Sequence, residues 1–194
     1  MMGLLNSAPE SVQIDGVQYA IHTDFRVSIQ IEQMALHGEM QTNAGVQRLL
    51  KLYFPVCPQN KEKACEIALW FFLCGQTNPK KQTTTNRITK RAYDYDLDAP
   101  YIFAAFMADY KIDLSTSALH WWKFHALFES LRPDNIICKI MEYRTNDLTK
   151  FKGADRAFYA QMQKQYALPV LKETNAACDA VAEFLMQPHN PESR

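Results

Sequence analysis

The fold is decided by one apolar stretch, Ala118-Leu-His-Trp-Trp-Lys-Phe-His-Ala-Leu-Phe-Glu-Ser-Leu131. Large apolar side chains occur on nearly every side of the helix that this stretch would form. A helix that is apolar nearly all round is buried nearly all round. We therefore predict a helix over 118–131 inside a compact domain, capped by the preceding Asp113-Leu-Ser-Thr116.

Apolar residues at helical spacing predict further helices on both sides of this stretch. We expect the caps of three of them to be Asp24, Asn43 and Asn60, and we expect Asp98 to cap a fourth that begins at Ala99-Pro100. Gly38, Pro55 and Gly75 mark the ends of the first three. Later helices are predicted from Pro133 to Arg144, around Phe158–Tyr166 and around Ala176–Met186.

A short β-hairpin is predicted near the N-terminus. Two alternating runs, Val12-Gln-Ile14 and Val17-Gln-Tyr19-Ala-Ile21, are joined by Asp15-Gly16. This dipeptide favours a type I′ turn because both of its residues tolerate positive φ. The expected fold class is therefore mainly α, a compact multi-helix domain with a short N-terminal β-hairpin.

A length of 194 residues corresponds to about one domain. We expect residues 1–148 to form the helical core, which includes the hairpin and a polar, basic loop over 76–92. Large apolar side chains are sparse in residues 149–194, so we expect this segment to be a C-terminal helical appendage.

Composition excludes several classes of protein. Lys plus Arg and Asp plus Glu both number 21, and this zero net charge argues against bulk nucleic-acid packaging. The longest strongly apolar run, Ile67-Ala-Leu-Trp-Phe-Phe-Leu-Cys74, is far shorter than the ~20 residues of a membrane span. The N-terminus lacks the pattern of a secretory signal, and 5 widely spaced cysteines indicate reduced thiols in a cytosol.

No familiar catalytic or metal-binding template is present. Asp94-Tyr-Asp96-Leu-Asp98 resembles the start of a calcium loop, but Ala99 and Ala105 replace the required Gly and Glu. His120 and His125 are five residues apart, whereas a zinc-binding pair on a helix uses four. We therefore expect no enzyme activity, no cofactor and no metal ion.

The loop over 76–92 carries the basic side chains Lys80, Lys81, Arg87, Lys90 and Arg91. They form a candidate interaction site for phosphates or an acidic partner. The loop has no aromatic residue on which a single-stranded nucleic acid would stack. The alternative interpretation of this segment is that it is an ordinary solvated loop without a partner.

The order of several motifs resembles a known family. Asp113-Leu114, Leu119-His120-Trp121-Trp122-Lys123-Phe124, Leu131 and Tyr143-Arg144 are similar to the phage "gene product fifteen" family over about residues 9–148. The segments around Thr23-Asp24-Phe25-Arg26 and Tyr93-Asp94-Tyr95-Asp96 agree with this family as well. We interpret its motif residues, Asp113, His120, Trp121, Trp122 and Phe124, as core residues.

The resemblance implies a protein encoded in the tail-morphogenesis region of tailed bacteriophages and prophages. It predicts a non-catalytic tail assembly chaperone in the host bacterial cytoplasm, which binds the tape-measure protein and other tail proteins, forms a homo-oligomer and does not contact membrane. Two alternatives remain open. One is a structural component of the tail or virion, and the other is a nucleic-acid-binding accessory protein that uses the basic loop.

Overall fold

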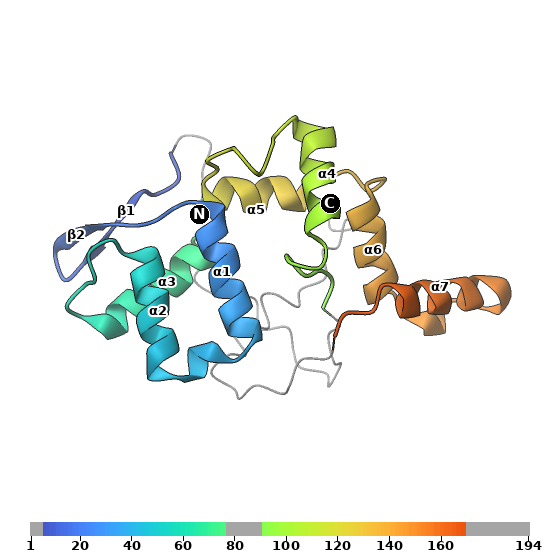
Figure 1. The fold of residues 1–194 in the computed structure, drawn as a ribbon, viewed down its shortest axis with the longest axis horizontal. Helices are drawn as coiled ribbons and strands as arrows, with labels where there is room; N and C mark the ends of the chain where they lie inside the picture. The colour runs from blue at the N-terminus through green and yellow to red at the C-terminus, as the bar shows by residue number, and fades with distance from the viewer. Residues whose placement is uncertain (1–5, 77–90, 170–194) are drawn as a thin grey trace. The chain divides into compact units, whose positions relative to one another are not determined.

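The computed structural model describes residues 6–76 and 91–169. The described residues form seven α-helices and one two-stranded sheet, which confirms the mainly α fold with an N-terminal hairpin (Figure 1). They fall into two compact units, of which the first comprises 6–76 and 118–126 and the second 91–117 and 127–169. The boundary expected at residue 148 stays a prediction.

The hairpin opens the first unit. Strand β1 (Ser11–Ile14) pairs antiparallel with β2 (Val17–Ala20), and Asp15 and Gly16 have φ of 49° and 81°. Positive φ at both turn residues is the requirement of a type I′ turn, so the predicted hairpin is confirmed. Val12 and Ile14 are buried, and β1 contacts α3.

Three helices follow in the first unit: α1 (Phe25–Leu36), α2 (Asn43–Tyr53) and α3 (Lys61–Phe72). As predicted, the side chains of Asp24 and Asn60 cap α1 and α3, because each accepts a hydrogen bond from a first-turn amide. The prediction for α2 is wrong by one residue. Asn43 is already helical, and extended Thr42 accepts the amide hydrogen bond of Gly45 at 2.9 Å.

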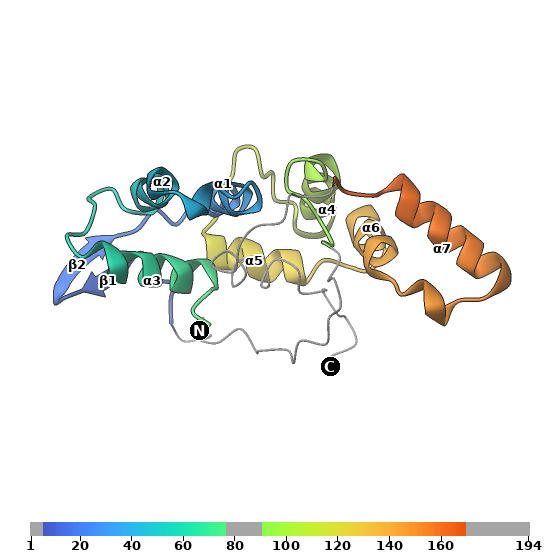
Figure 2. The same ribbon diagram turned by 90° about the horizontal axis from the view of Figure 1, so that it is seen from below.

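Helix α2 packs against both α1 and α3 (Figure 2). The Ser28 and Tyr53 hydroxyls share a buried hydrogen bond of 2.9 Å between α1 and α2. The short 3-10 helix Glu39–Gln41 leads into α2. Gly45 allows its backbone to approach closely, since a Cβ there would lie 1.9 Å from the Glu39 carbonyl oxygen.

The end of α3 differs in detail from the prediction. The helix ends at Phe72, and the first residue after it with a left-handed backbone is Cys74, with φ of 54°. Gly75 follows with φ of 80°, and its amide donates to the Trp70 carbonyl at 2.9 Å. The glycine therefore continues a left-handed turn that a non-glycine residue begins.

Helix α5 (Trp121–Glu129) begins in the first unit and ends in the second. The predicted start at residue 118 is wrong, because the preceding residues pair with the chain at the start of α1. The Phe25 amide donates to the Leu119 carbonyl at 2.9 Å, and the Trp121 amide donates to the Thr23 carbonyl at 2.7 Å. This pairing holds the backbone before Trp121 in an extended conformation.

The second unit contains α4 (Ala99–Tyr110), α6 (Ile136–Thr145) and α7 (Gly153–Gln165), with a 3-10 helix over Leu148–Lys150. Its core is apolar and comes mainly from α4, α5 and α6, with the buried side chains Ile102, Phe106, Phe128, Leu131, Ile137, Ile140 and Met141. Helix α7 packs on α6 and has no buried residue.

Two predicted starts in the second unit are wrong. Helix α6 begins at Ile136 rather than Pro133, because Pro133 belongs to a turn and Asn135 occupies the cap position. Helix α7 begins at Gly153, before the predicted Phe158. The helix predicted around 176–186 lies outside the described residues.

Candidate functional site

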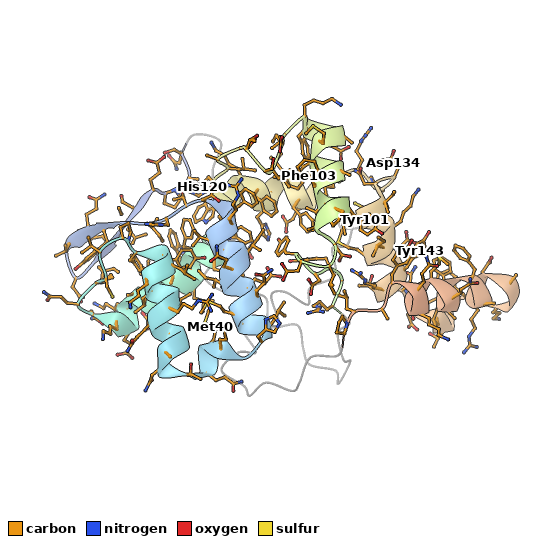
Figure 3. The ribbon with its side chains drawn as sticks, in the orientation of Figure 1. Met40, Tyr101, Phe103, His120, Asp134 and Tyr143 are labelled. Carbon is orange, nitrogen blue, oxygen red and sulfur yellow. The ribbon has the colours of Figure 1, made fainter. Side chains whose placement is uncertain are left out.

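The solvent-facing half of α4 is an apolar surface. Tyr101, Phe103 and Met107 are 37%, 38% and 36% exposed, and Ala104 and Ala108 beside them are exposed as well. Tyr101 and Phe103 are labelled on this helix in Figure 3. These five residues are called the α4 surface below. Its members include no charged side chain, which is uncommon for the exposed half of a surface helix.

The opposite half of α4 fixes the helix to the second unit. Ile102, Ala105 and Phe106 are buried in the core of this unit. The only charged side chain within the helix, Asp109, is 3% exposed and accepts hydrogen bonds from the Arg132 guanidinium at 2.7 Å and from Asn135 at 2.8 Å. The α4 surface is therefore presented by a firmly anchored helix.

The pKa of Asp109 reflects this environment. Burial raises the pKa of the carboxyl, but the hydrogen bonds from the Arg132 amide and guanidinium and from Asn135 outweigh burial and lower it. Asp109 stays ionised and bound to its partners at neutral pH. Because the Asp109 side chain is 3% exposed, its charge does not interrupt the α4 surface.

A buried ion pair positions the start of α4. Asp98 occupies the predicted cap position, but the expectation that its side chain caps the helix is wrong. Its two carboxylate oxygens accept hydrogen bonds from Arg144 at 2.5 and 2.9 Å, and one also accepts the Asp94 amide at 2.9 Å. The partner lies 46 residues along the chain, so no local pattern indicated the pair.

Arg144 joins three segments of the second unit. Besides Asp98, its guanidinium donates to the carbonyl oxygens of Ala92 at 3.0 Å and Tyr166 at 2.6 Å. Arg144 and Asp98 are 7% and 3% exposed. A buried charge is stable only when it is paired and hydrogen-bonded, and this arginine satisfies both requirements.

The tryptophans of the family motif lie in the core of the first unit. Trp121 and Trp122 are 1% and 4% exposed. Their indole N–H groups donate to consecutive carbonyls at the end of α3, Phe72 and Phe71, both at 2.8 Å. The last carbonyls of a helix have no partner within the helix, so the two indoles complete the hydrogen bonding of α3.

His120 ties this motif to the N-terminal segment. Its Nδ1 accepts the Trp122 amide at 3.0 Å, and its Nε2 therefore donates to the Pro9 carbonyl at 3.0 Å. Burial lowers the pKa of His120, while the Pro9 carbonyl acts in the opposite direction. The neutral imidazole thus links the Trp122 amide to the Pro9 carbonyl.

The other motif residues divide between core and surface. Phe124 is fully buried and stacks on Phe25 with ring centroids 4.6 Å apart. Asp113 lies at a turn in the second unit, where it accepts hydrogen bonds from the Ser115 hydroxyl and amide that lower its pKa. Asp113 thus belongs to the second unit, whereas the tryptophans belong to the first.

Of the basic residues expected to form an interaction site, the structure describes Arg91 only. Lys80, Lys81, Arg87 and Lys90 lie outside the described residues. The Arg91 side chain is 10% exposed and forms an ion pair with Asp94 at 3.2 Å. This arginine thus holds its own segment in place.

One hollow of about 340 Å³ lies in the first unit beside the family motif. Its lining includes Glu10, Asp24, His120 and Lys123. Within residues 6–76 and 91–169, no three His, Cys, Asp or Glu side chains are grouped to hold a metal ion. In the same residues, no helix has the length and apolar character needed to cross a membrane.

Comparisons with known proteins identify the family. The family model described as "Bacteriophage Gp15 protein" matches residues 4–168, which include every described helix. The match thus extends past the resemblance over 9–148 and takes in α7. Neither a search of curated proteins nor a search of solved structures finds a match. The chain belongs to the bacteriophage Gp15 protein family.

Proposed function

We propose that this phage protein is a non-catalytic tail assembly chaperone that binds the tape-measure protein in the host bacterial cytoplasm. The α4 surface is the observation that carries the proposal. Contiguous apolar patches at the surface of a soluble protein commonly mark sites where another protein binds. Membership of the Gp15 family supplies the phage context.

The shape of the α4 surface favours a helical client. Phe103, Ala104, Met107 and Ala108 recur at the spacing that places side chains on one face of a helix. A client helix with apolar residues at the same spacing would bury this face by packing alongside it. The two alanines leave room for close approach, and Phe103 and Met107 provide the larger contacts.

Co-expression with the tape-measure protein encoded by the same phage tests the proposal. We expect affinity capture of this chain to recover a stoichiometric complex in which the tape-measure protein stays in solution. Light scattering would give the number of copies bound. Absence of a complex, together with recovery of this protein from purified virions by mass spectrometry, would replace the chaperone with a structural tail component.

A charge variant locates the binding surface. Phe103→Glu with Met107→Glu places two carboxylates on exposed positions of α4, so we expect the fold to persist and capture of the tape-measure protein to be lost. Val56→Glu is the matched control, because Val56 is a 70% exposed apolar residue of the first unit. Equal capture by the α4 double variant and the control would exclude the α4 surface.

A further inference from the structure

Strand β1 has one edge without a partner among the described residues. A two-residue turn makes Ile14 and Val17 a hydrogen-bonded pair, and pairing alternates along an antiparallel ladder. The Ile21 amide donates to the Glu10 carbonyl at 3.0 Å, as this alternation requires. The amide and carbonyl groups of Ser11 and Gln13 therefore point away from β2.

This edge is short, which by itself limits pairing, but it lacks the other features that usually prevent strands from pairing. Natural edge strands commonly carry a charged side chain, a proline or a bulge. The sequence of β1 is Ser-Val-Gln-Ile, and its register with β2 is continuous. The edge is thus short but chemically open to another strand.

An apolar groove of about 330 Å³ runs beside the same strand. It is lined by Ser11, Val12 and Gln13 of β1 and by Ile67 and Trp70 of α3. Ile67 and Trp70 are both half-buried. The groove therefore places an apolar floor next to unpaired backbone groups, which is the combination that strand addition uses.

From this combination we infer that β1 is a self-association site, at which a second copy of this chain docks its own β1 antiparallel across a two-fold axis. Ser11 of each copy then faces Gln13 of the other, and the two Val12 residues face each other. Each Ser11–Gln13 pair exchanges two backbone hydrogen bonds, so the interface gains four such bonds. The two hairpins become one four-stranded sheet.

The register follows from the residues at both ends of β1. If the second strand were shifted toward the N-terminal end of β1, the pairing would require a backbone amide from Pro9, which has none. If the second strand were shifted toward the C-terminal end of β1, the pairing would require the backbone groups of Asp15, whose φ of 49° belongs to the turn. The register centred on Val12 therefore keeps all the outward-pointing groups of β1 paired.

The side chains agree with this register. Val12 of the second copy points to the same side of the sheet as Val12 of the first, over Ile67 and Trp70. Glu10 faces Ile14 of the second copy, so the paired strands set no like charges against each other. An isologous contact of this kind closes as a dimer and does not continue into a fibre.

Sedimentation and light scattering of the isolated protein over a wide concentration range test the inference without any client. We expect a reversible dimer. Gln13→Pro removes an amide that β2 does not use, so the hairpin is kept while each dimer loses two hydrogen bonds. Its dissociation constant should rise about tenfold or more. Gln18→Pro is the matched control on the opposite edge and should dimerise like the wild type.

A wild type that stays monomeric would overturn the inference, as would equal dimerisation by Gln13→Pro and Gln18→Pro with unchanged circular dichroism. If the proline variants unfold, Ser11→Lys with Gln13→Lys replaces them. In the dimer these substitutions oppose like charges across the two-fold axis, so dimerisation should be lost. A dimer that tolerates the lysines would equally refute the β1 interface.

Discussion

Replacing Trp121 by Phe tests the role of the buried indole at the end of α3. The change removes the 2.8 Å hydrogen bond to the Phe72 carbonyl, which also has the Cys74 thiol at the much longer distance of 3.9 Å. The loss of a hydrogen bond at a buried carbonyl costs about 1–3 kcal/mol, and truncation of a buried aromatic side chain adds about 1 kcal/mol. We therefore expect Trp121→Phe to lower the free energy of unfolding by about 2–4 kcal/mol.

Trp70→Phe is the matched control, because the indole of half-buried Trp70 donates no hydrogen bond to the described residues. Trp122→Phe should fall between the two, since the Phe71 carbonyl also accepts the Cys74 amide at 3.1 Å. Urea unfolding followed by far-ultraviolet circular dichroism measures all three variants without relying on tryptophan fluorescence. Equal losses for Trp121→Phe and Trp70→Phe would refute the hydrogen-bond argument.

Three further predictions concern stability. Arg144→Met leaves the Asp98 carboxylate buried without its counter-ion and should cost about 3–5 kcal/mol in urea unfolding; a loss below about 1 kcal/mol would contradict this. Because the pKa of His120 is lowered, its contribution to stability is complete above about pH 6.5 and declines as the pH falls further. His120→Gln should therefore flatten the decline in the free energy of unfolding between about pH 7.5 and 5.5, and an unchanged slope would count against it. Gly45→Ala forces a Cβ against the Glu39 carbonyl and should lower the free energy of unfolding by about 1–3 kcal/mol. An unaltered melting temperature would contradict this prediction.

Features encoded by neighbouring residues were predictable from the sequence. Asp15-Gly16 specified the hairpin turn, and the caps Asp24 and Asn60 marked the starts of α1 and α3. In each case the deciding hydrogen bond or backbone conformation involves residues within three positions of one another. Local chemistry of this kind is visible in sequence patterns.

Features that depend on distant partners were missed. The start of α5 is set by backbone pairing with residues near Thr23, about 100 positions earlier in the chain. Asp98 is a residue type that commonly caps helices, but its carboxylate binds Arg144 of another helix instead. Tertiary contacts override local preference at both places.

The candidate site was predictable only in part. The helix that begins at Ala99-Pro100 was predicted from its apolar residues, but their apolar character did not show that Phe103 and Met107 face solvent. That distinction requires knowledge of what surrounds each face of α4. The basic residues were predicted to form a site because of their charge. The α4 surface has no charged side chain, so the same criterion could not identify it.

The first unit is completed by a segment that the ribosome produces late. Residues 6–76 leave the ribosome well before Trp121, yet Trp121 supplies the donor for the α3 carbonyl of Phe72 and the amide that pairs with Thr23. At about 5–20 residues per second, the roughly 50 residues from Gln76 to Ala126 take about 2.5–10 s to synthesise. During that interval α1, α2 and α3 lack the core contacts that Trp121, Trp122 and Phe124 provide in the folded unit. Folding of this unit is therefore expected to lag behind its own synthesis until the Trp121–Phe124 segment arrives.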